Sequence, residues 1–261
     1  MTVIAKLSGG RDSSAMVLKM LENGEHIDEI IFSDTQQEFP EMYEYLDRFE
    51  RYIKENYGKK ILRLAHKRGE SFEDWVFGTL KSGKLKGWVR GLPNITNKCY
   101  WQRESKSNPV DHWIKENKIE NPTLCIGYTA SESKRVKKTT HDNKRFPLIE
   151  YSMCEGDIDS YLESHNLVNP LYKHYNRTGC AMCPYQHIRG YFILYKKYPK
   201  IWEWMKNIEK RLQDIEDTGQ RVINSQWKFE GTLLEIEQDF DDNPYQHDLA
   251  PGPQCQCTLG I

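Results

Sequence analysis

Short apolar runs alternate along this chain with stretches whose apolar residues recur at helical spacing. After the first run, residues 2–5, the apolar positions follow a helical pattern: Ala15, Met16, Leu18, Met20 and Leu21. Apolar runs at 29–33, 60–64 and 123–128 predict three more buried strands, with helical patterns between them. Strands that alternate with helices favour an α/β fold, in which a doubly wound, mostly parallel sheet carries helices on both faces.

Weaker patterns complete the chain. Residues 146–150 are expected to be extended, and 81–90, which are basic and dotted with glycine, predict a mobile loop. Beyond residue 216 the pattern fades. Apolar faces at helical spacing predict further helices that begin at about residues 40, 71, 109, 155, 187 and 199.

The composition narrows the chemistry. The chain has 261 residues, of which 38% are apolar and 12% aromatic, and its formal net charge is −1. So small a net charge excludes a global field that would drive the protein onto nucleic acid or a membrane, while local patches stay open. The sequence shows neither an apolar run of membrane-spanning length nor a signal-peptide pattern. We therefore expect a cytoplasmic protein without a membrane partner.

The turn between the first strand and the first helix carries the strongest candidate chemistry. It consists of Lys6-Leu7-Ser8-Gly9-Gly10-Arg11-Asp12-Ser13. Two adjacent glycines allow a sharp turn and a close approach of the backbone to a ligand. Asp12 and Ser13 are expected to cap the helix that follows. The amide groups and the dipole at the start of this helix favour an anion such as phosphate.

The motif Ser-Gly-Gly-x-Asp-Ser after an N-terminal strand resembles the PP-loop of the ATP pyrophosphatase superfamily, whose members are similar to adenine nucleotide alpha hydrolases. The resemblance implies a five-stranded HUP or Rossmann-like sheet that binds ATP with Mg²⁺. Arg11 stands where these proteins usually have lysine, and its planar guanidinium differs from a point charge. The alternative is an ordinary glycine-rich turn. The nucleotide-binding residues implied in this turn are Lys6, Ser8, Gly9, Gly10, Arg11, Asp12 and Ser13.

Two further strand ends extend the resemblance. Residues 34–41, Asp-Thr-Gln-Gln-Glu-Phe-Pro-Glu, are similar to a segment of the phosphoadenylyl-sulfate (PAPS) reductase branch of this superfamily; the alternative is an acidic helix start. After the fourth strand, Gly127 and then residues 132–135 are either a phosphate-facing group or a solvated basic helix start. The nucleotide-binding residues implied here are Asp34, Thr35, Glu38, Gly127, Glu132, Ser133 and Arg135.

The likeness continues through Gly91-Leu92-Pro93, Cys99, Lys106 and Pro109 and covers roughly residues 3–185. It divides the chain into three parts. We expect a nucleotide-binding α/β domain at 1–150, a helical region with a C-x-x-C motif at 151–215, and a tail with a C-x-C motif at 216–261.

Seven cysteines in a chain without an export signal indicate metal or sulfur chemistry before disulfides. Cys180 and Cys183 form a C-x-x-C motif, and Cys180 lies 81 positions after Cys99. Sulfonucleotide reductases with a 4Fe-4S cluster show a similar arrangement, although Tyr100 stands here in place of their second upstream cysteine. The resemblance implies that Cys99, Cys180 and Cys183 hold a 4Fe-4S cluster or part of a zinc site. The alternative is three free cysteines.

The remaining cysteines have less definite roles. Cys255 and Cys257 resemble the tail cysteine with which reductases attack the sulfonucleotide, and a thiolate would be the reactive form. Three roles are equally open for these two cysteines: fourth ligand of the metal site, nucleophile, or part of an inert tail. We interpret Cys125, within a strand, and Cys154, at a helix start, as structural.

Three hypotheses about function follow. In the first, a substrate oxygen attacks the α-phosphorus of ATP, pyrophosphate leaves, and the adenylated group accepts sulfur. In the second, a tail cysteine attacks adenylyl sulfate or its 3′-phosphate, and sulfite leaves. In the third, the chain binds a nucleotide without turnover. The intact loop and the missing second cysteine favour the first. The catalytic candidates are Arg11, Asp12, Arg135, Cys255 and Cys257.

The candidate partners are an adenine nucleotide, a nucleic-acid substrate (tRNA or DNA), a sulfur-donor protein and a second copy of the chain in a homodimer. Tryptophan and tyrosine side chains near residues 81–101 are placed either to stack on bases or to pack in a core. The sequence leaves the sulfur donor, the sulfur acceptor and the oligomeric state open.

Overall fold

The computed structural model describes residues 2–66, 70–93, 99–132, 136, 143–228 and 231–244. They form two compact units, each assembled from two stretches of chain. The sheet unit comprises residues up to 65 together with 105–173, and the helical unit comprises 66–104 together with 174–260. The segments 1–150, 151–215 and 216–261 are consecutive instead, and as functional domains they stay a prediction.

The sheet unit alternates strands with helices. Its elements are β1 (Val3–Leu7), α1 (Arg11–Glu22), β2 (Glu29–Ser33), α2 (Pro40–Tyr57), β3 (Ile61–Leu64), α5 (Asn108–Glu116), β4 (Thr123–Cys125), the 3₁₀ turn η2 (Ala130–Glu132), β5 (Lys144–Arg145), α7 (Pro147–Glu150), α8 (Glu155–Ser164) and the 3₁₀ turn η3 (Pro170–Lys173). The described strands form one five-stranded sheet in the order β3-β2-β1-β4-β5, and every pairing is parallel. The predicted α/β class and its parallel sheet are therefore confirmed.

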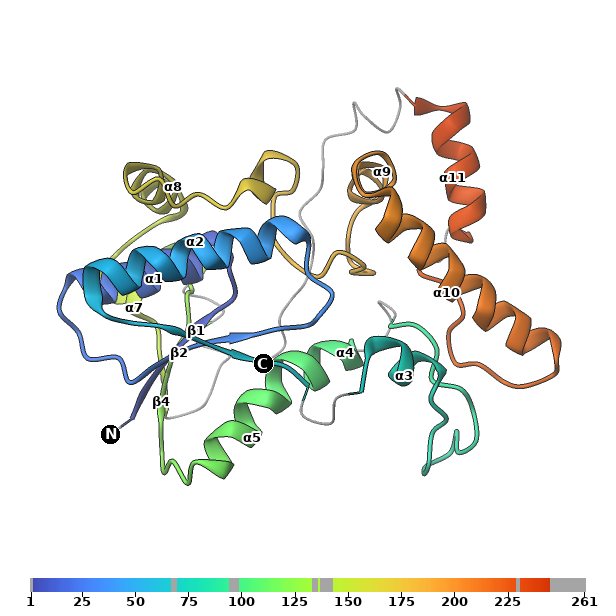
Figure 1. Cartoon of the computed structure of the whole chain (residues 1–261), viewed down its shortest axis with the longest axis horizontal. Coiled ribbons are helices and arrows are strands. Elements are labelled where there is room, and N and C mark those ends of the chain that lie inside the picture. The colour runs from blue at the N-terminus through green and yellow to red at the C-terminus, as the bar shows by residue number, and fades with distance from the viewer. Residues whose placement is uncertain are drawn as a thin grey trace. The chain divides into compact units, whose positions relative to one another are not determined.

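Both faces of the sheet are covered by helices. Figure 1 shows α1 and α2 on one face and α5 on the other. On the α5 face, Ile4 of β1, Ile31 of β2 and Val110 of α5 form a buried cluster. Because side chains alternate along a strand, Lys6 shares this face with Ile4, and Leu7 faces α1 and α2. The apolar runs are thus buried on both sides, as parallel strands require.

The edge next to β4 departs from the predicted pattern. The expectation that 146–150 is extended is wrong: β5 lies earlier, and 147–150 form the helix α7. Pro147 explains the difference, because its fixed φ angle suits the first position of a helix. The fourth strand is also shorter than predicted, since it ends at Cys125 and the Tyr128 N–H donates to the Ile126 carbonyl in a tight turn.

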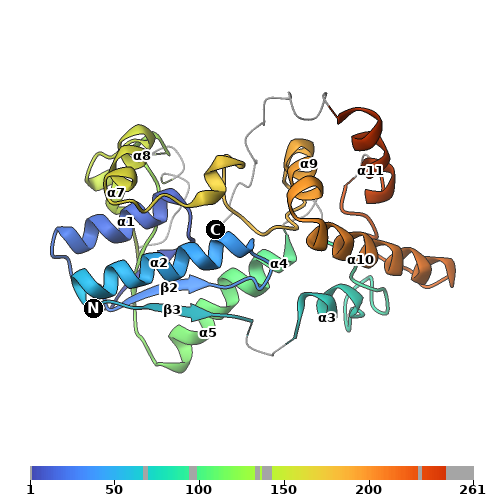
Figure 2. The same ribbon diagram turned by 45° about the horizontal axis from the view of Figure 1, so that its top comes forward.

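The helical unit is held together by aromatic side chains. Its helices are α3 (Phe72–Phe77), α4 (Tyr100–Gln102), α9 (Ile188–Lys197), α10 (Pro199–Asp217) and α11 (Leu233–Asp242), and the π-helical turn η1 (Arg103–Ser107) leads from α4 towards α5. Figure 2 shows α9 and α10 as consecutive helices. Phe72, Trp101, Trp202 and Phe240 are all fully buried. No helix in the described ranges combines the length and apolarity needed to span a bilayer.

Two segments of the helical unit differ from the sequence-based expectation. Helix α11 lies where the hydrophobic pattern is weak, and a capping box between Thr232 and Glu235 begins it. Residues 81–90, expected to be a mobile loop, lie within a hairpin formed by residues 78–91, here called the basic hairpin. Leu80 N–H donates to the Trp88 carbonyl, and Arg90 N–H donates to the Gly78 carbonyl.

Candidate functional site

The turn between β1 and α1 is closed by its own serines. The Ser13 hydroxyl accepts a hydrogen bond from Ser8 N–H at 3.0 Å and donates to the Gly10 carbonyl at 3.1 Å. The two serine hydroxyls lie 2.9 Å apart. Gly9 has a φ angle of +73°, and a Cβ atom there would overlap the sulfur of Met42. Glycine is therefore required at this position both by the backbone and by the neighbouring side chain.

The capping residue of α1 is not the one expected. Gly10 is the N-cap residue, and it has no side chain with which to cap. The expectation that Asp12 and Ser13 cap the helix is wrong, because both lie within its first turn. Ser13 uses its hydroxyl to close the turn instead. The positive end of the α1 dipole still favours an anion at this turn.

Residues from the end of the sheet unit hold the turn from outside. The Asn169 side-chain amide donates to the Gly9 carbonyl at 2.8 Å. The Tyr172 hydroxyl accepts from Arg11 N–H at 3.0 Å. Both residues belong to the turn 169–172, Asn-Pro-Leu-Tyr. The missed signal was the polar residue on each side of Pro170-Leu171.

The guanidinium of Arg11 is engaged with α8. It lies 3.0 Å from the Asp159 carboxylate and 3.7 Å from that of Glu155. It also lies 5.4 Å from the centre of the Tyr172 ring. These contacts direct the charge of Arg11 towards α8, so its side chain ties a helix to the turn. Its predicted role towards phosphate stays a prediction.

Gly127 brings the end of β4 against the same turn. A Cβ atom built on Gly127 would lie 2.8 Å from both the Cα and the N of Ser13. The glycine therefore packs directly on the backbone of the first turn of α1. β1 lies between β2 and β4 in the sheet, so this contact sits at the topological switch point, where open α/β sheets bind ligands.

The acidic segment after β2 is well ordered. The Asp34 carboxylate accepts hydrogen bonds from Gln36 N–H at 2.7 Å and from the Tyr43 hydroxyl at 2.9 Å. The Thr35 hydroxyl donates to the buried Glu38 carboxylate at 2.9 Å. Burial, together with the hydrogen bond to Asp34, raises the pKa of Tyr43 above its usual range. Tyr43 is therefore a neutral phenol that donates its proton to the hydrogen bond with Asp34.

Lys106 completes this group with a positive charge. Its Nζ lies 3.6 Å from the Glu38 carboxylate, and its carbonyl accepts from the Ser33 hydroxyl at 3.0 Å. Lys106 lies in the π-helical turn η1, a type of turn that recurs at functional sites. The sequence identifies Lys106 only as part of the likeness to the family. The fold brings its side chain to Glu38.

The other predicted nucleotide-binding residues lie at different places. Lys6 lies on the α5 face of the sheet. Burial lowers the pKa of Lys6; the Asp111 carboxylate opposes this shift, and the positive charge of Lys144 adds to it. Glu132 accepts a hydrogen bond from Thr129 N–H at 3.3 Å. Ser133 and Arg135 lie outside the described residues, as do Cys255 and Cys257. The turn, Gly127 and the segment 34–38 thus share the carboxyl edge of the sheet.

The cysteines of the predicted cluster all belong to the helical unit. Cys180 and Cys183 form a turn in which Cys183 N–H donates to the Cys180 carbonyl, and Cys99 precedes α4. Among the described residues, no three histidine, cysteine, aspartate or glutamate side chains gather in a group that could hold a metal ion. Cys125 is fully buried, and burial raises the pKa of its thiol to about 11. This agrees with a structural role for Cys125.

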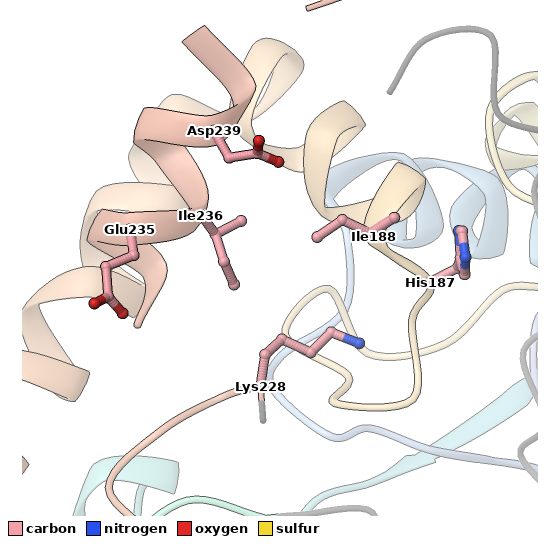
Figure 3. A pocket seen from close by; sticks show the side chains of 6 residues that line it. All are labelled: His187, Ile188, Lys228, Glu235, Ile236 and Asp239. Carbon is pink, nitrogen blue, oxygen red and sulfur yellow. The ribbon is translucent and has the colours of Figure 1, made fainter. Parts of the chain in front are cut away.

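A pocket of about 380 Å³ lies between the start of α9 and α11 (Figure 3). It is lined by His187, Ile188, Lys228, Glu235, Ile236 and Asp239. Lys228 donates hydrogen bonds to the carbonyls of Pro184 and Gln186. It therefore fixes the chain that directly follows Cys183.

The contact between Asn169 and Gly9 predicts a measurable role for that residue. We expect Asn169→Ala to lower the free energy of unfolding by about 1–3 kcal/mol, because it leaves the Gly9 carbonyl without its buried donor. Urea denaturation measures this. Asn56→Ala is the control: Asn56 makes a similar hydrogen bond, to the Tyr52 carbonyl, at an exposed site. Equal losses in the two variants would contradict the role of Asn169.

The sheet order, the glycine turn and Gly127 define the class: an α/β protein with a candidate phosphate-binding turn at the switch point of a parallel sheet. The model of the phosphoadenosine phosphosulfate reductase domain matches residues 2–186. The chain therefore belongs to the phosphoadenosine phosphosulfate reductase domain family.

The similar proteins add little about activity. Two uncharacterized proteins of Methanocaldococcus jannaschii are 29% identical over 241 residues and 25% identical over 237 residues. The matches cover 87% and 85% of this chain but 46% and 50% of the relatives, so the chain spans about half their length. The phosphate complex of a PAPS reductase from Candida auris matches with a TM-score of 0.48 and 17% identity, over 69% of this chain and 82% of that one.

Proposed function

We propose that this protein binds ATP at the turn 8–13 and transfers its adenylyl group to a substrate oxygen, with release of pyrophosphate. The observation that supports this most directly is the intact Ser-Gly-Gly-x-Asp-Ser turn, seated at the switch point with Gly127 against its helix. A long phosphate tail suits the first-turn amides of α1, because these amides and the helix dipole favour an anion.

The neighbouring groups have complementary roles in this proposal. Asp34, held by Tyr43, and the Thr35–Glu38 pair face the nucleoside end. Lys106 supplies positive charge at the same edge. A substrate oxygen forms a bond to the α-phosphorus, the bond from that phosphorus to the bridging oxygen breaks, and pyrophosphate leaves. Catalysis here is mostly positioning and charge neutralisation, to which Mg²⁺ adds when bound.

In the adenylated product, sulfur then forms a bond to the activated carbon or phosphorus, the bond from that atom to the adenylyl oxygen breaks, and AMP leaves. A nucleic-acid acceptor would thereby become a thiolated base or a phosphorothioate. A 4Fe-4S cluster remains a prediction for this sulfur step. Among the described residues, Cys99, Cys180 and Cys183 do not form a group that could hold a metal ion. No step of the proposed mechanism runs through a cluster.

The second candidate function is reduction of a sulfonucleotide, which the description of the matching family favours. In this reaction no pyrophosphate leaves, so the turn would hold a shorter phosphate group. The two candidates therefore differ in their products and not only in their rates.

Product analysis tests the proposal. The full chain is incubated with Mg²⁺, ATP labelled at the α-phosphate and bulk tRNA or genomic DNA. We expect pyrophosphate together with labelled nucleic acid or AMP, and we expect excess EDTA to abolish both, because Mg²⁺ neutralises the phosphates. Parallel reactions contain adenylyl sulfate or PAPS with a thiol reductant. Sulfite there, or ATP binding without turnover, would refute adenylation.

A further inference from the structure

The basic hairpin is an ordered projection of the helical unit. Its two arms are joined by the hydrogen bonds already described, and Val89 N–H donates to the Arg221 carbonyl, which ties it to residues 221–223. The segment follows α3 in Figure 1 and doubles back on itself. Gly83 and Gly87, both with positive φ angles, shape its tip. Side chains on this tip are therefore presented by a fixed backbone.

The hairpin carries only positive charge. Lys81, Lys84 and Lys86 are exposed, and none forms an ion pair with a described side chain. The hairpin and residues 220–224 contain no aspartate or glutamate. The nearby acid Glu73 is already paired with Arg211. The basic hairpin is therefore a locally positive surface, although the net charge of the whole chain is only −1.

Aromatic rings alternate with these cations. The Arg221 guanidinium lies 5.1 Å from the centre of the half-buried Trp88 ring. The Arg90 guanidinium lies 4.3 Å from the Trp75 ring and 5.3 Å from the Tyr100 ring. Stacked rings and guanidinium planes give flat surfaces on which bases stack.

Polar atoms in this cluster lack partners. Arg90 Nε, Trp75 Nε1 and His66 Nδ1 are buried, and none of them has a hydrogen-bond partner in the described structure. The His66 ring lies 5.3 Å from the Trp75 ring, and the Arg90 guanidinium lies 4.3 Å from it, so the three atoms belong to neighbouring side chains. Buried donors are costly when unpaired, and two of these three are obligate donors. They point to a ligand that offers acceptor atoms.

We propose that the basic hairpin and the Arg90–Trp75–Tyr100 cluster bind single-stranded nucleic acid. Phosphates would meet the three lysines, and bases would stack on Trp88 and the arginines. Single strands fit better than a duplex because stacking needs unpaired bases. They fit better than a membrane because Leu85 is the single large apolar side chain exposed at the described tip. This inference deepens the proposed function, on which it rests, by specifying a single-stranded acceptor and the surface that binds it.

Fluorescence anisotropy with the full chain tests the lysines. The probe is a labelled single strand of about 20 nucleotides, longer than the roughly 4–16 nucleotides that such sites cover. The triple variant Lys81→Ser, Lys84→Ser, Lys86→Ser is expected to bind at least about tenfold more weakly. Its slope of log affinity against log salt should fall by about 2, at roughly 0.7 per lost phosphate contact. The control removes three exposed lysines of the sheet unit: Lys54→Ser, Lys60→Ser and Lys115→Ser.

A second variant separates stacking from charge. Trp88→Leu is expected to weaken binding roughly 5- to 100-fold and to leave the salt slope unchanged. Its backbone bond to Leu80 is kept, and circular dichroism checks that the variant folds. Equal affinity of the lysine triple and its control, equal binding of a duplex, or a preference for vesicles of phosphatidylcholine and phosphatidylglycerol would each overturn the inference.

The two proposals fail separately. Strand binding that depends on the hairpin, without pyrophosphate release, would refute adenylation and keep the nucleic-acid surface. Pyrophosphate release by a chain that does not bind the strand would refute the surface alone.

Discussion

Replacing Gly127 by alanine is expected to slow pyrophosphate release from ATP by at least about 100-fold, because displacements of about 1 Å in a positioned site have effects of this size. The added Cβ would lie 2.8 Å from Ser13 N and Cα and 2.9 Å from the Asp12 carbonyl carbon. These are backbone atoms, which cannot move aside as a flexible side chain does. Either the first turn of α1 or the end of β4 must shift, and both border the candidate phosphate site.

Gly156→Ala is the matched control for this variant. A Cβ on Gly156, within α8, would meet nothing within 4 Å. We expect its kinetics to be unchanged and its stability to rise by about 0.5–1 kcal/mol, since alanine favours a helix over glycine. Steady-state kinetics and circular dichroism on both variants make the comparison. Wild-type kinetics of folded Gly127→Ala would show that β4 does not position the turn.

The parts of the fold that depend on neighbours in sequence were predictable. The apolar runs at 29–33 and 60–64 match β2 and β3 to within a residue, because a strand buried on both faces needs a continuous apolar segment. The glycine pair at 9–10 lies in a sharp turn for the same local reason. β5 escaped prediction because two residues, Lys144 and Arg145, give no apolar pattern. Ion pairs, which leave no periodic pattern in the sequence, hold that edge: Arg145 pairs with Glu25 and Glu150.

The candidate site was predictable in its motifs and not in its contacts. The sequence singled out Gly127, but its packing on Ser13 depends on how β4 lies beside β1. Asn169 and Tyr172 support the turn from far along the chain. Asn169, for example, lies 160 positions after Gly9, whose carbonyl it binds. No pattern within one element encodes such a pair. The ion pair between Arg11 and Asp159 likewise joins residues that lie far apart in the sequence. It ties the Arg11 side chain to α8.

A large loss of stability is expected from Glu209→Ala in the helical unit. Glu209 lies in α10 and is 3% exposed. Its carboxylate accepts from Trp227 N–H at 3.0 Å and from Leu233 N–H at 2.5 Å. Leu233 is the first residue of α11, so one carboxylate joins α10 to the start of a second helix. Losing two hydrogen bonds to a charged acceptor is expected to lower the free energy of unfolding by about 3–6 kcal/mol.

Denaturation of Glu209→Ala beside Glu216→Ala, an exposed position on the same helix, measures this loss. The exposed variant is expected to change stability by about 0.5 kcal/mol or less. A Glu209→Ala variant as stable as the control would show that the carboxylate does not hold α11.

The same residue predicts how stability varies with pH. Burial raises the pKa of Glu209 above its ordinary 4.5, although the two backbone hydrogen bonds oppose this. The folded state therefore holds the proton more tightly than the unfolded state. The stabilisation that results is complete below pH 4.5 and is lost as the pH rises through the raised pKa. Glu209→Gln removes this titration, so the wild type should lose stability relative to Glu209→Gln as the pH rises from 4.5. A stability difference that stays constant with pH would show that burial does not outweigh the two hydrogen bonds.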